Sequence, residues 1–530
     1  MPTSPAPAAR PNVVVILVDD MGYSDIGCYG SEIETPNLDR LAGEGVRFSQ
    51  MYNTARCCPA RASLLTGLHP HQAGVGHMVN DRGIPAYQGF LNDRCLTLAE
   101  VLREGGYRTL MSGKWHIGGQ YQADEPENWD PGGPGHPIPT QRGFDRFYGT
   151  LHGAGSYFNP YTLMEQDRFV APEGEDYYYT DVISRRAADM VGEAAAEATP
   201  FFLYLAYTAP HWPLHALPED IARFAGRYEE GWDVGRERRL ARMREMGLID
   251  ADWPLSPRDG TAPAWADAEH KEWEAMRMAV YAAQVHAMDR GVGTVVERLE
   301  ALGILDHTLI VFLSDNGGCA EGLGPDGWTP RQPTTTRDGR PVRFGNAPSI
   351  VPGPADTFMS YDLPWANMSN TPFRLYKHWT HEGGIATPLI LRGPGVPRSG
   401  GIVHAPAFLP DIMATCCDAT GVARPDTAAG GPIPAADGVS LLPATRGEPL
   451  ARKGPLCFEH EGNRAVREGR WKLVCRYPGD WELYDMDTDR TELNDLAAQC
   501  PEVTARLAAV WDAWAERCGV RPWDEMGARK

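Results

Sequence analysis

Three runs of apolar residues constrain the fold of this chain more than any other feature. In each run nearly every position is apolar, rather than every second one. This pattern is typical of strands buried on both faces of a mostly parallel sheet. The runs span residues 12–18, 201–207 and 308–314, and a shorter strand is predicted at 107–111.

Helical patterns alternate with these strands. The predicted helices span residues 35–42, 96–104 and 276–302, and another follows Cys57. The alternation predicts an α/β fold: a large mixed, mostly parallel sheet flanked by helices. Sheets of this kind bind ligands at the carboxyl ends of their strands. Residues 222–272 show no clear periodicity and are interpreted as an insertion, and 319–365 as loop.

The end of the chain has a different pattern, which predicts a smaller C-terminal α+β lobe with a short antiparallel sheet. Short strands are predicted within 465–474 and 481–484, followed by a helix at 503–517. With 530 residues the chain is long enough for more than one domain. The expected division is a loose tail at 1–10, a main domain at 11–440 and a C-terminal subdomain at 441–530.

Charge and composition exclude some classes of partner. The formal net charge of −20 disfavours nucleic acid and anionic membrane surfaces. The N-terminal residues lack the basic and apolar regions of a signal peptide, and the apolar run at 13–18 is too short to span a bilayer. Eleven scattered cysteines show no zinc-ligand spacing and suggest reduced thiols. These features predict a cytoplasmic protein.

Polar pairs follow two of the predicted buried strands. Asp19 and Asp20 come after the first, and Asp315 and Asn316 after the last. Because strand ends of a parallel sheet share one edge, the four side chains offer oxygen ligands for a hard divalent cation, Ca²⁺ or Mg²⁺. Solvated strand ends are the alternative for either pair alone.

The stretch from Cys57 to Gly67 combines a nucleophile, a cation and a helix start. Pro59 suits the first turn of a helix, so Cys57 is expected just before the helix N-terminus, where backbone N–H groups favour an anion. Arg61 lies one turn later and is expected to reach back over Cys57. The alternative is a buried cysteine beside a surface arginine.

Four further cationic or titratable residues lie in short glycine- or proline-rich strings. Lys114 and His116 belong to Gly-Lys-Trp-His-Ile-Gly, and their spacing of two places them on one side of extended backbone. His211 lies between prolines, and Lys377 precedes Glu382-Gly-Gly. A surface lysine and a core histidine are the alternative for the first string.

Together these strings resemble the motifs of type I, formylglycine-dependent sulfatases of the alkaline phosphatase superfamily. Cys-x-Pro-x-Arg with Leu-Thr-Gly is the most specific, although Ala60 stands where many members have Ser. The stretch from Gly74 to Met78 looks most like bacterial arylsulfatases. The resemblance implies an alkaline-phosphatase-like fold.

The resemblance also implies a role for each residue. Cys57 would be oxidised to Cα-formylglycine by a formylglycine-generating enzyme. Lys114 and Lys377 would bind sulfate oxygens, His116 the formylglycine hydroxyl and His211 the leaving-group side, while Arg61 adds positive charge. The metal, Ca²⁺ rather than Mg²⁺ or Mn²⁺, would be held by Asp19, Asp20, Asp315, Asn316 and the modified Cys57.

The implied function is hydrolysis of small-molecule sulfate monoesters, especially aryl sulfates, by a formylglycine gem-diol. One alternative is a phosphonate monoester or phosphodiester hydrolase of the same superfamily, and another is a non-catalytic anion- or metal-binding protein. The remaining histidines of these regions are interpreted as structural or substrate-pocket residues: His71, His77, His378 and His381. His215 lies close to His211 but is ranked below it, because it falls outside the motif.

Overall fold

The computed structural model describes residues 10–120, 130–324 and 333–527. The expected loose tail lies almost wholly outside these residues. Among the described residues no helix is both long and apolar enough to cross a lipid bilayer.

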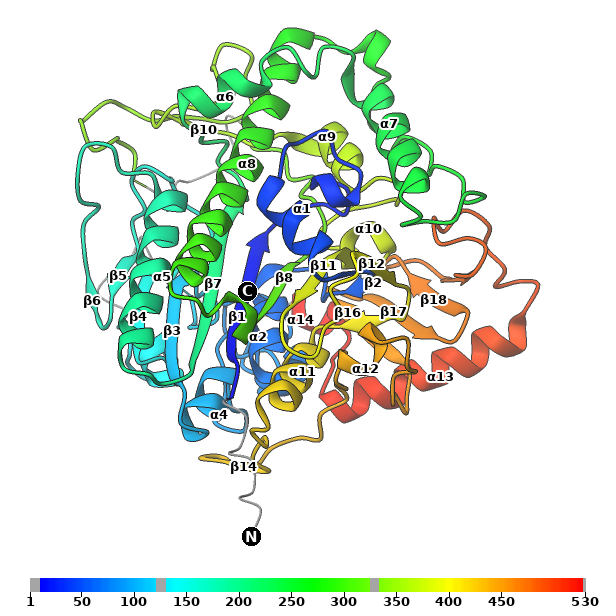
Figure 1. The fold of residues 1–530 in the computed structure, drawn as a ribbon. Coiled ribbons are helices and arrows are strands. Elements are labelled where there is room, and N and C mark those ends of the chain that lie inside the picture. The colour runs from blue at the N-terminus through cyan, green and yellow to red at the C-terminus, as the bar shows by residue number, and fades with distance from the viewer. Residues whose placement is uncertain (1–9, 121–129, 325–332, 528–530) are drawn as a thin grey trace.

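A single eleven-stranded sheet forms the centre of the molecule (Figure 1). Its middle strand β1 (Asn12–Asp19) pairs in parallel with β7 (Phe201–Pro210) on one side and β8 (Thr308–Ser314) on the other. Beyond β7 lie β3 (Arg108–Gly113), β4 (Arg146–Thr150), β5 (Leu163–Glu165) and β6 (Arg168–Phe169). Beyond β8 lie β11 (Ala386–Arg392), β2 (Val46–Tyr52), β12 (Gly401–Val403) and β13 (Ala407–Phe408).

The predicted mixed, mostly parallel sheet is therefore confirmed. Only the pairs that involve β11 or β5 are antiparallel. All eight residues of β1 are buried, as its unbroken apolar pattern predicted.

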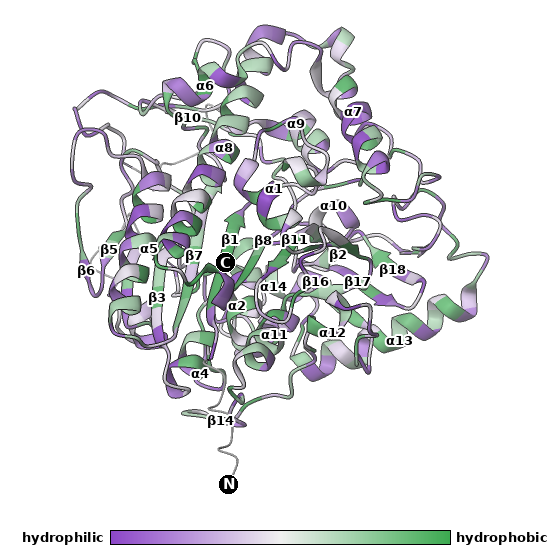
Figure 2. Cartoon of the chain, in the orientation of Figure 1, coloured by the Kyte–Doolittle hydropathy of each residue, from purple (hydrophilic) through white to green (hydrophobic). Residues whose placement is uncertain are grey.

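The side chains of β1 alternate between two apolar cores, one on each face of the sheet. Val14 and Ile16 belong to one core, and Val13 and Val15 to the other. Helices cover both faces (Figures 1 and 2). The first core includes α1 (Pro36–Gly43), α5 (Tyr179–Ala196) and α8 (Lys271–Ala301). The second includes α2 (Cys57–Thr66), α4 (Leu98–Glu104) and α11 (Pro410–Thr420).

A four-stranded antiparallel sheet follows near the C-terminus, as predicted. It consists of β16 (Leu456–His460), β17 (Asn463–Glu468), β18 (Trp471–Cys475) and β19 (Trp481–Asp485). Helix α13 (Pro501–Cys518) packs Leu507 and Trp511 against Leu473 of this sheet. The boundary at residue 440 stays a prediction.

Buried ion pairs fasten this small sheet to the main domain. Lys472 on β18 lies 2.8 Å from Glu382, and Arg490 lies 2.8 Å from the other oxygen of the same carboxylate. Both cations are fully buried. Glu382, which the sequence places in the Lys377 motif, therefore anchors the sheet.

The segment at 222–272 is more regular than its sequence indicates. It contains the end of α6 (Pro218–Phe224) and the whole of α7 (Gly231–Glu245). Helix α7 buries Arg239, which forms ion pairs with Asp25 and Glu32. An apolar periodicity is therefore missing, because part of the buried face of α7 is charged.

The predicted loop at 319–365 contains two strands, β9 (Arg343–Phe344) and β10 (Thr357–Phe358), and the start of α9 (Asp362–Ser369). The remaining helical elements are η1 (Gly27–Tyr29), α3 (Pro70–Ala73), η3 (Pro139–Arg142), η4 (Trp265–Asp267), η5 (Leu305–His307), α10 (Glu382–Ile385), α12 (Leu442–Thr445) and α14 (Trp523–Gly527). The remaining strands are β14 (Thr427–Ala428) and β15 (Gly431–Pro432).

Candidate active site

The carboxyl ends of β1 and β8 bring the predicted oxygen ligands together. The backbone N–H of Asp20 donates to Oδ1 of Asp315 over 3.2 Å, and Nδ2 of Asn316 donates to Oδ1 of Asp20 over 2.7 Å. Asp19, Asp20, Asp315 and Asn316 are all buried, so solvated strand ends are excluded. Asp20 has a φ of 63°, an uncommon conformation for a residue other than glycine and one that clusters at functional sites.

Two oxygen atoms in this group suit a hard cation. Oδ1 of Asp19 and Oδ1 of Asn316 are buried and have no hydrogen-bond partner among the described residues. Such atoms are rarely left unpaired in a protein interior. Carboxylate and amide oxygens are the ligands that Ca²⁺ and Mg²⁺ prefer. The residues therefore fit the predicted metal.

Three cations balance the three carboxylates. Lys114 donates to Asp19, and Lys377 lies 2.8 Å from Asp20. Arg61 lies 3.2 Å from Asp315. Burial alone would raise the pKa of Asp19, but Lys114, His211 and Arg61 outweigh it and lower that pKa to about 2. Burial and the charge of Asp19 raise the pKa of Asp315 well above its usual value.

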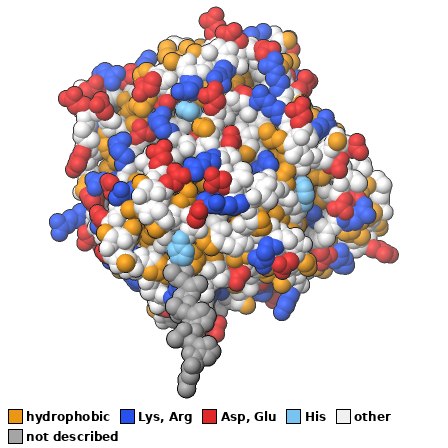
Figure 3. Space-filling model, in the orientation of Figure 1, with side chains coloured by type: hydrophobic (Ala, Val, Ile, Leu, Met, Phe, Trp, Pro, Cys, Tyr) orange, Lys and Arg blue, Asp and Glu red, His pale blue; other side chains and the backbone are white. Residues whose placement is uncertain are grey.

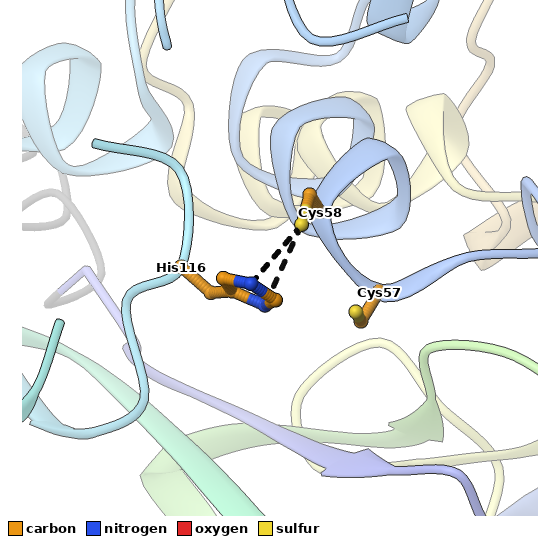
Figure 4. Close-up of side chains that lie close together, drawn as sticks. All are labelled: Cys57, Cys58 and His116. Atoms are coloured by element: carbon orange, nitrogen blue, oxygen red, sulfur yellow. Dashed lines mark hydrogen bonds between the residues drawn. The ribbon is translucent and has the colours of Figure 1, made fainter. Parts of the chain in front are cut away.

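Cys57 is the first residue of α2 rather than the residue before it, because the helix begins one position earlier than expected. Figure 4 shows its side chain beside Cys58 and His116. A hydrogen bond with Cys58 lowers the pKa of Cys57 well below the usual thiol value, and the Lys114 charge adds to this against the opposing effect of burial. A lowered pKa makes a thiol more reactive.

That Arg61 reaches back over Cys57 stays a prediction. Its guanidinium donates to the backbone oxygen of Lys114 over 3.0 Å and to Oδ2 of Asp315 over 3.2 Å. It is fully buried, which excludes the surface-charge alternative. Arg61 thus joins the end of β3 to the end of β8.

Lys114 and His116 were expected on one side of extended backbone; the backbone at His116 is not extended, but both side chains lie close enough to Cys57 to act on its thiol. His116 has a φ of 56°, so the backbone turns between them. Lys114 contacts Asp19, whereas the ring nitrogens of His116 lie 3.3 and 3.5 Å from Sγ of Cys58. Burial lowers the pKa of His116 to about 4, so the ring is neutral near pH 7.

His211 and Lys377 meet on the other side of the site. Nδ1 of His211 donates to the backbone oxygen of Trp212 over 2.6 Å, which leaves Nε2 as an acceptor. Nζ of Lys377 lies 3.4 Å from that Nε2 and 2.8 Å from Asp20. Burial lowers the pKa of His211, while Asp20 overcomes burial and raises the pKa of Lys377 well above its usual value.

The structure adds residues that the sequence did not indicate. Nη1 of Arg56 lies 2.8 Å from Oε1 of Glu321, and Nε1 of Trp212 donates to Oε2 of the same carboxylate over 3.1 Å. Cys58 contacts His116 directly. Cys58 could have been recognised as a site residue from its adjacency to Cys57. Nothing in the sequence around Glu321 indicates a functional residue. His215 faces away and bonds to the backbone oxygen of Thr357.

The fold and site define a hydrolase class: an α/β protein that gathers a nucleophile, cations and oxygen ligands at one sheet edge. Comparison with known proteins identifies the family. The sulfatase family model matches residues 11–422. An arylsulfatase of Klebsiella aerogenes is 35% identical over 470 residues, which cover 84% of this chain and 94% of that protein.

Two further comparisons agree. An uncharacterized sulfatase of Schizosaccharomyces pombe is 33% identical and aligns over 97% of this chain and 95% of that protein. The crystal structure of Ps i-CgsB in complex with k-i-k-neocarrahexaose has a TM-score of 0.68 at 27% identity, covering 97% of this chain and 94% of that chain. The chain therefore belongs to the sulfatase family and is a sulfuric ester hydrolase, which confirms the implied hydrolysis of sulfate esters.

Proposed function

We propose that this chain hydrolyses aryl sulfate esters at Cys57 after its oxidation to Cα-formylglycine, with Ca²⁺ bound beside it. The observation that carries the proposal is the position of Cys57, at a helix N-terminus next to buried lysines and unpaired buried oxygens. The arylsulfatase of Klebsiella aerogenes, a relative at 35% identity, supports the aryl leaving group.

Asp19, Asp20, Asp315 and Asn316 would hold the metal together with the modified side chain at position 57. A bound divalent cation supplies a Lewis acid for a sulfate oxygen. Calcium suits this set because it accepts many oxygen ligands in flexible geometry.

The hydrated aldehyde of formylglycine supplies a hydroxyl nucleophile. His116 is neutral near pH 7, and its ring faces the start of α2, so it can accept a proton from a hydroxyl at position 57. A formylglycine-generating enzyme acts on Cys57 before the first turnover.

Lys114 and Lys377 bind the sulfate oxygens. Both side chains are buried, so their charges act in a water-poor site where electrostatic stabilisation is strong. Arg61 holds the Lys114 backbone and the Asp315 carboxylate in position through its hydrogen bonds to both.

Protonation of the leaving oxygen is shared between Lys377 and His211. In the tautomer that Trp212 imposes, Nε2 of His211 carries a lone pair and faces the Lys377 ammonium. Lys377 therefore supplies the proton, directly or through Nε2 of His211. This arrangement supports both residues as acids rather than His211 alone.

Measurements with 4-nitrophenyl sulfate, an alkyl sulfate and bis(4-nitrophenyl) phosphate test the function. We expect the highest kcat/KM for the aryl sulfate. A higher kcat/KM for the phosphodiester would favour a phosphodiesterase, and no turnover by protein with formylglycine at position 57 would favour a binding protein.

The location of the chain is a separate proposal. All eleven cysteines are free thiols, which supports a reducing compartment such as the cytoplasm.

A further inference from the structure

A second cluster of metal-ligating side chains lies where the C-terminal sheet meets the active-site loops. It consists of His77, His378, His460 and Glu461, which we call the imidazole cluster. His77 follows α3, His378 follows Lys377, and His460 and Glu461 lie where β16 ends and turns toward β17. Residues from three distant parts of the chain thus converge on one point.

Glu461 is the centre of the cluster. Its Oε1 lies 2.6 Å from Nε2 of His77, and its Oε2 lies 2.9 Å from Nδ1 of His378. One ligand atom each from His378, His460 and Glu461 lie within 4.8 Å of one another. This spacing allows one ion to touch all three.

His460 is the side chain that hydrogen bonding within the cluster does not explain. It is fully buried, and neither ring nitrogen has a hydrogen-bond partner among the described residues. Nε2 of His460 lies 3.8 Å from Oε1 of Glu461, beyond hydrogen-bond distance. Its ring stacks on His77, with centroids 5.8 Å apart, and meets the edge of His378 at 5.6 Å.

A network of ion pairs would satisfy Glu461 but would leave His460 unpaired. A metal ion would use the lone pair of His460 and the shared carboxylate together. The geometry points to a divalent transition-metal site of the zinc class, with His378, His460 and Glu461 as ligands and His77 at the same carboxylate.

The donor chemistry separates this site from the one at the sheet edge. Imidazole nitrogens with one carboxylate suit Zn²⁺, whereas a set of carboxylate and amide oxygens suits Ca²⁺. Glu461 and His378 keep 23% and 29% of their side-chain surface exposed, so an ion can reach the cluster from solvent.

An ion here would act as a clamp. His378 is the residue after Lys377, and it has a φ of 91°. An ion shared with Glu461 would hold the Lys377 loop against the C-terminal sheet, without contact with the substrate. His378 is thus a positioning residue for Lys377.

Cobalt binding tests the site, because tetrahedral nitrogen-rich Co²⁺ absorbs visible light strongly and oxygen-bound Co²⁺ does so weakly. We use the Cys57→Ala protein, stripped with a chelator, so that the result is independent of the proposed catalytic function. We expect one equivalent of Co²⁺ with intense visible bands, displaced by Zn²⁺ but not by Ca²⁺. Absence of such bands would overturn the proposal.

Variants locate the bound ion. His378→Ala and Glu461→Gln, both at part-exposed positions, should each weaken Co²⁺ binding by roughly 100-fold or more. His69→Gln is the matched control, since His69 is a buried histidine paired with Asp437 outside the cluster, at 2.9 Å. Unchanged binding by folded His378→Ala and Glu461→Gln proteins would contradict the assignment, as would equal weakening in His69→Gln.

The positioning role has its own readout. With 4-nitrophenyl sulfate varied from well below to well above KM, Zn²⁺ added to stripped, Ca²⁺-loaded enzyme should raise kcat/KM, and it should have no effect on the Glu461→Gln enzyme. An equal response of both enzymes would refute the clamp.

Discussion

The sheet-edge site and the imidazole cluster differ in the chemistry of their side chains. In the first, three buried carboxylates face three built-in cations, Lys114, Lys377 and Arg61. In the second, one carboxylate faces three imidazoles. Figure 3 shows acidic and basic side chains interspersed over one face of the molecule.

The difference shows how one chain can keep two metals apart. The sheet-edge site offers carboxylate and amide oxygens, which a hard cation prefers. The imidazole cluster offers imidazole nitrogens, which a borderline cation prefers. A mutation in one site should therefore leave metal binding at the other site unchanged.

The largest effect should come from the nucleophile. Cys57→Ala should lower kcat by at least about 10⁴-fold, because loss of a covalent nucleophile removes the whole route. The thermal midpoint should stay close to the wild-type value, since the change is small. Cys58→Ala is the matched control and should keep most of the activity. Substantial turnover by Cys57→Ala would refute the formylglycine mechanism.

Asp315→Asn should separate the two metal sites. It removes a carboxylate from the sheet-edge site and should weaken Ca²⁺ binding by roughly 100-fold, with a parallel loss of activity. Metal analysis should find Co²⁺ binding at the imidazole cluster unchanged. Equal loss of both metals would contradict the independence of the two sites. An unchanged Ca²⁺ content would remove Asp315 from the ligand set.

Lys377→Ala should affect substrates according to their leaving group. If Lys377 supplies the leaving-group proton, kcat should fall most for poor leaving groups such as alkyl alcohols, and less for 4-nitrophenol. A series of substituted phenyl sulfates measures this as a steeper dependence of log kcat on leaving-group pKa. An unchanged slope would limit Lys377 to anion binding.

The smallest effect concerns a histidine–carboxylate pair for which we propose no metal. Asp437 bonds to His69 and Arg517, and these partners outweigh burial and lower its pKa to about 2. The folded state thus favours the ionised form, so the stabilisation is present above pH 4 and is lost as pH falls toward 2. The side chain of Asp437 is 36% exposed, so solvent screens part of this effect, and the stabilisation amounts to about 1 kcal/mol.

Urea unfolding measures that pair. The free energy of unfolding of wild type should exceed that of Asp437→Asn by about 1 kcal/mol near pH 6. This difference should disappear as pH falls toward 2. A difference in unfolding free energy that stays constant with pH would show that Asp437 does not stabilise the fold through its charge.

The sheet-edge site could be predicted because its ligands are neighbours in sequence. Asp19–Asp20 and Asp315–Asn316 each follow an apolar strand, and a parallel sheet brings such ends together. The central sheet followed from the same pattern. The backbone turn at His116 could not be predicted, because a positive φ at a residue other than glycine leaves no compositional mark.

The imidazole cluster could not be predicted for a different reason. Its histidines lie at positions 77, 378 and 460, without the short spacing that marks a metal motif. They meet only because β16 and β17 dock against the loop that carries Lys377. Similarly, helix α7 escaped prediction because it buries Arg239 with Asp25 and Glu32, and an apolar stripe was the signal sought.

The mass of the peptide Cys57–Arg61 tests the central claim most directly. Trypsin releases it from denatured protein made in its own host by cleavage after Arg56 and Arg61, and Cys58 within it serves as an internal thiol control. We predict an aldehyde at position 57 and a single alkylation, at Cys58. Two alkylated thiols in protein that turns over 4-nitrophenyl sulfate would contradict the account.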